Sequence, residues 1–156
     1  MRLVLLVPVA LLALAAVSRA DPPPTPSPAP APLVESPLAV ARRHYDRRQY
    51  DQALQLYRAH GDRRGELAAL KAIRGEHYDR KQFAKVIETA ELALAIQREL
   101  HDRAGEALEL RELGVARLEL RQLPEALEAL RAALAIHQEL GLREATAMTL
   151  DWIGVA

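Results

Sequence analysis

Apolar residues recur at spacings of three and four positions through most of the chain, with charged residues between them. In residues 84–100, for example, Val86, Ala90, Ala93 and Leu94 follow this spacing. It puts the apolar side chains on one face of an α-helix. Leu and Ala supply most of the apolar residues, whereas the chain has one Phe, one Trp and four Tyr. Such a composition suits close helix packing better than strands, so the pattern predicts an all-α domain.

The helical pattern repeats along the chain. A shift of forty residues places the segment 93–96, ALAI, on the identical segment 133–136. A shift of thirty-three residues places the segment 44–50, HYDRRQY, on the segment 77–83, HYDRKQF. Fixed periods of this length are typical of a solenoid, in which each unit buries its apolar face against its neighbours. We expect helix pairs over about residues 36–61, 64–100 and 104–140, and a partial unit over 144–156.

The first twenty residues have the layout of a secretory signal peptide. Arg2 supplies a positive charge, residues 3–17 are apolar, and Ser18 and Ala20 are small residues just before Asp21. The apolar run would reach about 22 Å as a helix, short of the ~30 Å hydrocarbon layer of a membrane. We therefore expect residues 1–20 to be cleaved off and the protein to be exported to the periplasm or the extracellular space. The alternative is an uncleaved segment that anchors the protein in the membrane.

Residues 21–35 form a proline-rich linker. Residues 22–32 read PPPTPSPAPAP, and proline fixes φ and removes backbone donors, so neither a helix nor a sheet can form there. This composition predicts a semi-rigid polyproline II spacer of roughly 30 Å. A PxxP ligand for an SH3-like domain is the alternative interpretation of the same residues.

Charge and residue types exclude several classes of function. Lys plus Arg and Asp plus Glu both number 21, so the charge balance gives no reason to expect nucleic acid as a partner. The absence of cysteine excludes disulfides, thiolate zinc sites and a lipid-modified cysteine. The five histidines show no metal-ligand spacing, and His44 and His77 are equivalent repeat positions. No phosphate-binding glycine loop or nucleophile motif is present, so we expect no enzyme, metal site or cofactor.

The helix pairs resemble tetratricopeptide repeats, whose two-helix units carry small residues where the helices cross. The residues that carry the resemblance are Leu110, Leu113, Gly114, Leu123, Ala126, Leu130 and Ala133 in the third unit, Tyr50, Ala53 and Tyr57 in the first, and Leu70, Phe83, Ala90 and Ala93 in the second. Arg74, Val86 and Arg117 depart from the family pattern. The resemblance covers about residues 36–156 and implies a right-handed superhelical stack of antiparallel helix pairs, an α-solenoid.

In this family the first helices of successive repeats line a concave groove that holds a peptide or a partner helix. The resemblance places nine residues in the groove: Arg42, Tyr45, Asp46, Lys71, Tyr78, Asp79, Arg111, Leu118 and Glu119. Arg42, Lys71 and Arg111 fall in three successive repeats and could form a basic ladder for a carboxylate or an acidic peptide. Solvated charges on an exposed helix face are the alternative. The sequence thus predicts an exported, non-enzymatic scaffold that binds a protein or peptide partner.

Two other functions stay open. The chain could be the N-terminal interaction part of a longer enzyme or signalling protein, or a membrane-tethered assembly factor if its leader stays attached. Residues 144–156 are only part of a unit, so Met148, Leu150, Trp152 and Ile153 would leave an apolar face uncovered. Either the sequence is a fragment of a longer chain, or the final helix caps the stack or docks on another copy as a homodimer.

Overall fold

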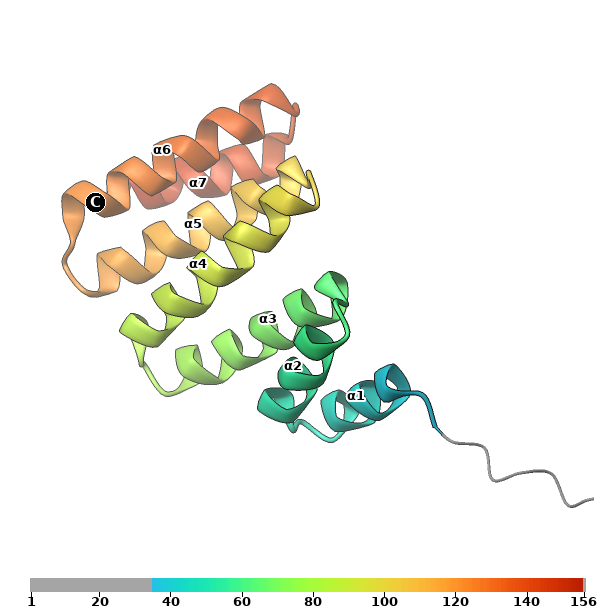
Figure 1. Ribbon diagram of the computed structural model, residues 1–156. Helices are drawn as coiled ribbons and strands as arrows, with labels where there is room; N and C mark the ends of the chain where they lie inside the picture. The colour runs from blue at the N-terminus through green and yellow to red at the C-terminus, as the bar shows by residue number, and fades with distance from the viewer. Residues whose placement is uncertain (1–34, 156) are drawn as a thin grey trace, which may run out of the picture. The chain divides into compact units, whose positions relative to one another are not determined.

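The computed structural model describes residues 35–155, in which every regular element is an α-helix (Figure 1). The helices of this range are α1 (Pro37–Asp46), α2 (Tyr50–Ala59), α3 (Arg63–Asp79), α4 (Phe83–Glu99), α5 (Arg103–Glu119), α6 (Leu123–Glu139) and α7 (Arg143–Val155). The all-α prediction is confirmed. The predicted signal peptide and nearly all of the proline-rich linker lie outside the described residues. Among residues 35–155, no helix has both the length and the apolar character needed to cross a membrane.

Three residues connect each helix to the next, and the middle residue has a positive φ. It is Arg121 between α5 and α6, with a φ of 59°, and Gly141 between α6 and α7, with a φ of 66°. The following residue donates its amide hydrogen back to the preceding helix, as Gln122 does to the carbonyl of Arg117 at 2.9 Å. This Schellman-type ending stops the helix and reverses the chain. Leu123, which the resemblance places at the turn, is the first residue of α6.

The two sequence periods have a structural cause. α2 has 10 residues, whereas α4 and α6 have 17 residues each. The seven residues that α2 lacks are about two helical turns, and they are the difference between the shifts of thirty-three and forty residues. The first helix pair is therefore a shortened version of the same unit.

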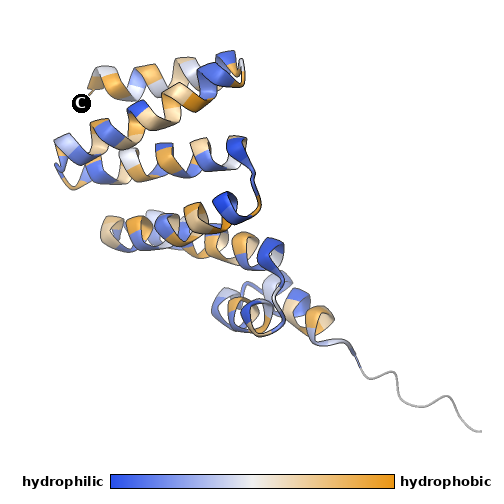
Figure 2. Ribbon diagram, turned by 45° about the horizontal axis from the view of Figure 1, so that its top comes forward, coloured by the Kyte–Doolittle hydropathy of each residue, from blue (hydrophilic) through white to orange (hydrophobic). Residues whose placement is uncertain are grey.

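Each helix packs against the helix before it and the helix after it, so the pairs stack in chain order (Figure 1). Apolar and polar residues alternate around the helices (Figure 2). One buried apolar cluster consists of Ala41, Ala53, Leu54, Tyr57, Ala69, Leu70, Ile73 and Ile96. A second consists of Ala90, Leu94, Ala107, Leu110, Leu113, Ala129, Ala133 and Ile136. The described residues thus form an all-α helical repeat stack, as the sequence predicts.

Equivalent residues of the first two units have equivalent surroundings. His44 Nδ1 lies 2.8 Å from Gln49 Oε1. In the second unit, His77 Nδ1 lies 2.9 Å from Gln82 Oε1. Each histidine therefore holds the connection between the two helices of its own pair, which explains why the motif recurs at a shift of thirty-three residues.

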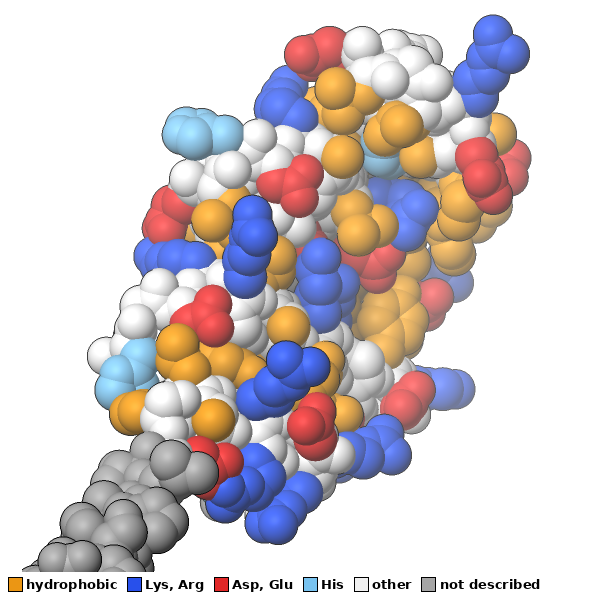
Figure 3. All heavy atoms as spheres, turned by 90° about the vertical axis from the view of Figure 1, so that its right-hand side faces the viewer, with side chains coloured by type: hydrophobic (Ala, Val, Ile, Leu, Met, Phe, Trp, Pro, Cys, Tyr) orange, Lys and Arg blue, Asp and Glu red, His pale blue; other side chains and the backbone are white. Residues whose placement is uncertain are grey.

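A ladder of ion pairs crosses the junctions where an even-numbered helix meets the next odd-numbered one. At the α2–α3 junction, Glu66 binds Arg58 at 2.7 Å and Arg63 at 2.8 Å. Arg63 also reaches Glu99 at the end of α4, at 2.6 Å. Forty residues later the same contacts join Arg98, Arg103, Glu106 and Glu139. Figure 3 looks onto these junctions, where basic and acidic side chains are interleaved.

The two central carboxylates of this ladder remain charged to low pH. Burial by itself raises the pKa of Glu66 and Glu106, but hydrogen bonds from two arginines to each outweigh burial and lower the pKa below the ordinary 4.5. A carboxyl group whose pKa is lower in the folded state stabilises the fold above its unfolded pKa. The contribution of the ladder is therefore lost as the pH falls below about 4.5.

The start of α5 offers a test of this junction. Asp102 accepts a hydrogen bond from the Gly105 amide at 2.9 Å, as Asp62 does from Gly65 at the start of α3. We expect Asp102→Ala to lower the free energy of unfolding by about 1 kcal/mol, because an N-cap is lost. Asp62→Ala should cost a similar amount, and the exposed Asp151→Ala should change it by less than about 0.5 kcal/mol. Urea unfolding followed by circular dichroism measures all three.

Candidate functional site

The groove residues predicted from the sequence lie on the odd-numbered helices α1, α3 and α5. Those that are exposed are Arg42, Asp46, Asp79 and Glu119; those that are half-buried are Tyr45, Lys71, Tyr78, Arg111 and Leu118. Side chains of α3 contact α5 through Glu109, and Arg111 of α5 contacts Met148 of α7. We call the surface formed by the predicted residues of α3 and α5 and the neighbouring side chains of α7 the odd-helix face, and the printed contacts of Tyr45 on α1 are with α2.

Lys71 has a carboxylate partner within the protein. Its Nζ lies 3.4 Å from Oε1 of Glu109, whose side chain is fully buried. Arg74 binds the other oxygen of the same carboxylate. Two cations of α3 therefore share one buried anion of α5, which fixes the position of Lys71 before any ligand binds.

Arg111 is engaged in a similar way. Its Nη2 lies 3.0 Å from Oε1 of Glu112, and its Nη1 lies 4.0 Å from the sulfur of Met148. Its side chain is only 15% exposed. Two of the three cations of the predicted basic ladder, Lys71 and Arg111, are thus paired with carboxylates of the protein itself, and Arg42 is the exposed one.

Tyr45 and Tyr78 each pack against an aromatic residue of the second helix of their own pair. Tyr45 packs edge-to-face on Tyr50, with ring centroids 5.2 Å apart, and Tyr78 packs on Phe83 at 5.6 Å. Burial raises the pKa of Tyr78, and carboxylates of α5, Glu112 first among them, raise it further. Tyr78 therefore lies toward α5, where the odd-numbered helices adjoin.

A hollow lies where the C-terminal ends of α5 and α7 meet the α5–α6 connection and the first residue of α6. Its volume is about 290 Å³, and it is lined by Leu118, Glu119, Arg121, Leu123, Trp152 and Val155. It thus brings together two of the predicted groove residues, Leu118 and Glu119. Sequence reasoning did not assign Trp152 to the groove, although a single tryptophan in a chain so poor in aromatic residues was the available signal. We call this hollow the Trp152 pocket.

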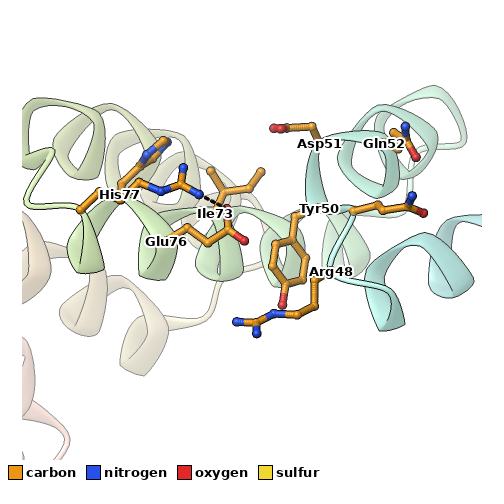
Figure 4. Close-up of a pocket in the computed structure, with 9 residues that line it drawn as sticks. Arg48, Tyr50, Asp51, Gln52, Ile73, Glu76 and His77 are labelled. Carbon is orange, nitrogen blue, oxygen red and sulfur yellow. Dashed lines mark ion pairs between the residues drawn. The ribbon is translucent and has the colours of Figure 1, made fainter.

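A second hollow, of about 270 Å³, lies between the α1–α2 connection and α3. Arg48 lines it from the α1–α2 side, and Glu76 and His77 line it from α3 (Figure 4). Glu76 already faces Arg80 at 3.8 Å, and His77 is bonded within its own unit. Within residues 35–155, no three His, Cys, Asp or Glu side chains gather as a metal site would require.

A third hollow, of about 440 Å³, lies between α4 and α6 over α5. Its apolar lining includes Leu94, Leu110 and Leu113, which belong to the buried core of the stack. At its rim, Arg117 binds Glu91 at 3.3 Å. This hollow is the space between two even-numbered helices, and two of the charged residues at its rim, Arg117 and Glu91, are paired with each other.

His137 connects α6 to α7 and is nearly fully buried. Its Nδ1 lies 3.1 Å from the hydroxyl oxygen of Thr149, and that hydroxyl donates its own hydrogen to the carbonyl of Ala145 at 2.8 Å. Thr149 must therefore accept the bond, so His137 carries its hydrogen on Nδ1 in the neutral ring. Burial lowers the pKa of His137 below the ordinary 6.5, and the nearby Arg111 lowers it further.

The stability of the α6–α7 contact should therefore depend on pH. Between the folded pKa of His137 and the ordinary value of 6.5, the unfolded chain binds more protons than the folded chain. The stabilising contribution of the neutral His137 is therefore fully present above pH 6.5 and decreases as the pH falls below that value. We expect the midpoint of thermal unfolding to fall more between pH 7 and pH 5 in the wild type than in the variant His137→Gln. Glutamine is chosen because the equivalent position of the preceding unit is Gln97. Parallel slopes for the two proteins would contradict this assignment.

Comparison of the chain with models of known protein families gave no match, and comparison with curated proteins gave none. The functional interpretation therefore depends on the residues and geometry described above.

Proposed function

We propose that this protein is an exported scaffold of the tetratricopeptide type that binds a protein or peptide partner through the odd-helix face, without catalysing a reaction. Stacked helix pairs support this proposal because they form extended surfaces on which side chains of successive units stand in register. The regular repetition of the units, down to the bonded histidines of the first two, supports the family assignment.

The observation that carries the proposal is the Trp152 pocket. Its lining includes a tryptophan and two leucines together with two residues of opposite charge, Glu119 and Arg121. Tryptophan and arginine are enriched among the residues that dominate binding energy at protein interfaces. A hollow of about 290 Å³ lies just below the usual size of small-molecule sites, and it suits one apolar side chain of a partner, with polar atoms beside it.

Affinity capture from the exported fraction tests the proposal. The full chain, produced with its own leader, is compared with the double variant Leu118→Glu/Glu119→Lys, which places a charge in the pocket and reverses one at its rim. We expect wild-type protein to retain a specific partner and the variant to lose most of it. Loss of one well-packed anchor typically costs about 2 kcal/mol or more, which is a fall in affinity of roughly thirtyfold.

A matched control separates this face from the rest of the surface. Leu92→Glu/Glu88→Lys makes the same two changes on exposed residues of α4. The control variant should capture the partner as well as the wild type does. Equal capture by all three proteins would reject the odd-helix face, and loss of capture only by the α4 variant would move the site to the even-numbered helices.

Export is a separate part of the proposal. N-terminal sequencing of the protein recovered outside the cytoplasm should give a first residue of Asp21, because cleavage is expected after Ala20. Recovery of an intact leader in the membrane fraction would instead favour the membrane-tethered assembly factor.

A further inference from the structure

The α6–α7 junction differs from the α2–α3 and α4–α5 junctions because it lacks their ladder of ion pairs. At the α4–α5 junction, Glu106 binds Arg98 at 2.8 Å and Arg103 at 2.6 Å. Forty residues later, the positions of Glu106 and Arg98 are occupied by Thr146 and Gln138. Among the described residues, no ion pair joins α7 to another helix. A different contact therefore holds α7 on α6.

That contact is the bond between His137 of α6 and Thr149 of α7. Among the described residues of α7, Thr149 alone is buried, at 0% exposed, and His137 is 3% exposed. The residues of α2 and α4 that are equivalent to His137 are Tyr57 and Gln97. Neither a tyrosine nor a glutamine changes its charge between about pH 5 and 8, whereas histidine does. The buried residue that joins the two helices is thus titratable in this pH range at the α6–α7 junction and not at the two junctions before it.

The surroundings of His137 do not favour a positive charge. Arg111 on α5 is the charged residue that acts on the ring, and it is itself positive. Its carboxylate partner, Glu112, is bound to it at 3.0 Å. The charged residues of α7 and the nearest one along α6 are all exposed: Arg143, Glu144, Asp151 and Glu139. A protonated His137 therefore needs water around its ring, and water reaches the ring only if α7 moves away from α6.

We propose that protonation of His137 in mildly acidic solution releases α7 from α6 and thereby opens the Trp152 pocket, so that the protein lets go of its partner. Trp152 lies three residues after Thr149, about one helical turn, and with Val155 it forms the α7 side of the pocket. The rest of the stack stays in place because Glu66 and Glu106, whose pKa values are lowered by their arginines, keep their charge to below about pH 4.5. Release of the partner depends on the proposed function of the Trp152 pocket, whereas release of α7 does not.

Hydrogen–deuterium exchange of the full chain, resolved by mass spectrometry, measures the release of α7 without a partner. The protection factor of an amide falls as the population of the opened state rises. Between pH 7 and pH 5 we expect the protection factors of α7 to fall by up to about 25-fold, because the opened His137 binds a proton with its ordinary pKa of 6.5. The protection factors of α4 and α5 should stay nearly constant. A fall in α7 that begins only below about pH 4.5 would overturn the proposal, because carboxylates would then be the groups that titrate.

Two variants show whether His137 is the group responsible. His137→Gln introduces the residue of the α4–α5 junction, and His137→Gln/Ala145→Gly also introduces the glycine that Gln97 faces there, Gly105. In both variants the protection factors of α7 should be the same at pH 7 and pH 5. The other four histidines are present in all three proteins, so their titration does not affect the comparison. An equal fall in the wild type and in either variant would overturn the proposal, as would a fall that extends over α4 and α5.

Capture of the partner separates this regulation from the proposed function. Partner bound to the wild type at pH 7 should be released at pH 5, and partner bound to His137→Gln should be retained. Retention by both proteins, with α7 open in the wild type, would overturn the release of the partner and reject the Trp152 pocket as its site. Release from both would overturn control by His137. If no partner is captured at pH 7, the proposed function fails, and hydrogen exchange alone decides whether α7 is released.

Discussion

Arg74→Ala is expected to lower the free energy of unfolding by about 3–5 kcal/mol, the largest effect of any single substitution proposed for this protein. Glu109 is fully buried between α3 and α5, and Arg74 is its bonded partner. Removing the guanidinium leaves a buried carboxylate whose remaining contact is Lys71, at 3.4 Å and without a hydrogen bond to that oxygen. Urea unfolding followed by far-ultraviolet circular dichroism measures the loss.

Two controls distinguish a buried ion pair from the mere loss of an arginine. Arg117→Ala removes the same side chain from a pair with Glu91 in which the glutamate is 55% exposed, so it should cost no more than about 1 kcal/mol. The double variant Arg74→Met/Glu109→Leu should recover most of the stability, since apolar side chains of similar size can replace a buried pair. An Arg74→Ala cost of less than about 1 kcal/mol would contradict a buried ion pair between Arg74 and Glu109.

The second large effect is a difference between two glycines at equivalent positions. Gly114→Val should lower the free energy of unfolding by about 1–3 kcal/mol, because the new side chain would overlap Leu130 of α6. Gly154→Ala should raise it by up to about 1 kcal/mol, because alanine favours the helix and nothing lies within 4 Å of its Cβ. The same urea experiment gives both values.

The two substitutions are expected to change the free energy of unfolding in opposite directions, and this difference is what the comparison tests. If both glycines merely reflected a composition rich in small residues, both substitutions would favour the helix and both would stabilise the protein. A destabilising effect of Gly154→Ala would mean that α7 is covered as α5 is. A stabilising effect of Gly114→Val would contradict the close crossing of α5 and α6.

The sequence was sufficient to predict the helices and their pairing. The three- and four-residue spacing of Ala and Leu indicates which face of each helix is buried. The repeated segments HYDRRQY and HYDRKQF indicate equivalent connections between helices. The left-handed residues at the connections were harder to predict, since Arg48, Lys81, His101 and Arg121 occupy positions where glycine is the usual signal. Gly61 and Gly141 were the recognisable cases.

The candidate site was only partly predictable. The spacing within the repeats places Arg42, Lys71 and Arg111 on equivalent helices, but periodicity does not reveal which carboxylate each cation meets. Glu109 stands where the neighbouring units have Ala69 and Thr149, so the repeat pattern gave no reason to expect a buried anion there. Arg74, which departs from the pattern of tetratricopeptide repeats, pairs with this carboxylate of the next odd-numbered helix.

Trp152 illustrates the same limit for the pocket. Its spacing assigns it to the apolar side of the last helix, whereas its position beside Leu118 depends on how α7 lies against α5. Contacts between helices that are not adjacent in the chain depend on the angle of stacking, which the apolar pattern of a single helix does not determine. The α3–α5 and α5–α7 contacts therefore emerge only from the three-dimensional arrangement.

The central claim is that a partner binds across the odd-numbered helices. Hydroxyl-radical footprinting of the captured complex tests it most directly, because the method reads the solvent exposure of individual side chains. We predict that oxidation of Trp152 and Leu118 falls on partner binding while oxidation of Leu92 on α4 stays unchanged. Protection of Leu92 with unchanged oxidation of Trp152 and Leu118 would contradict the claim.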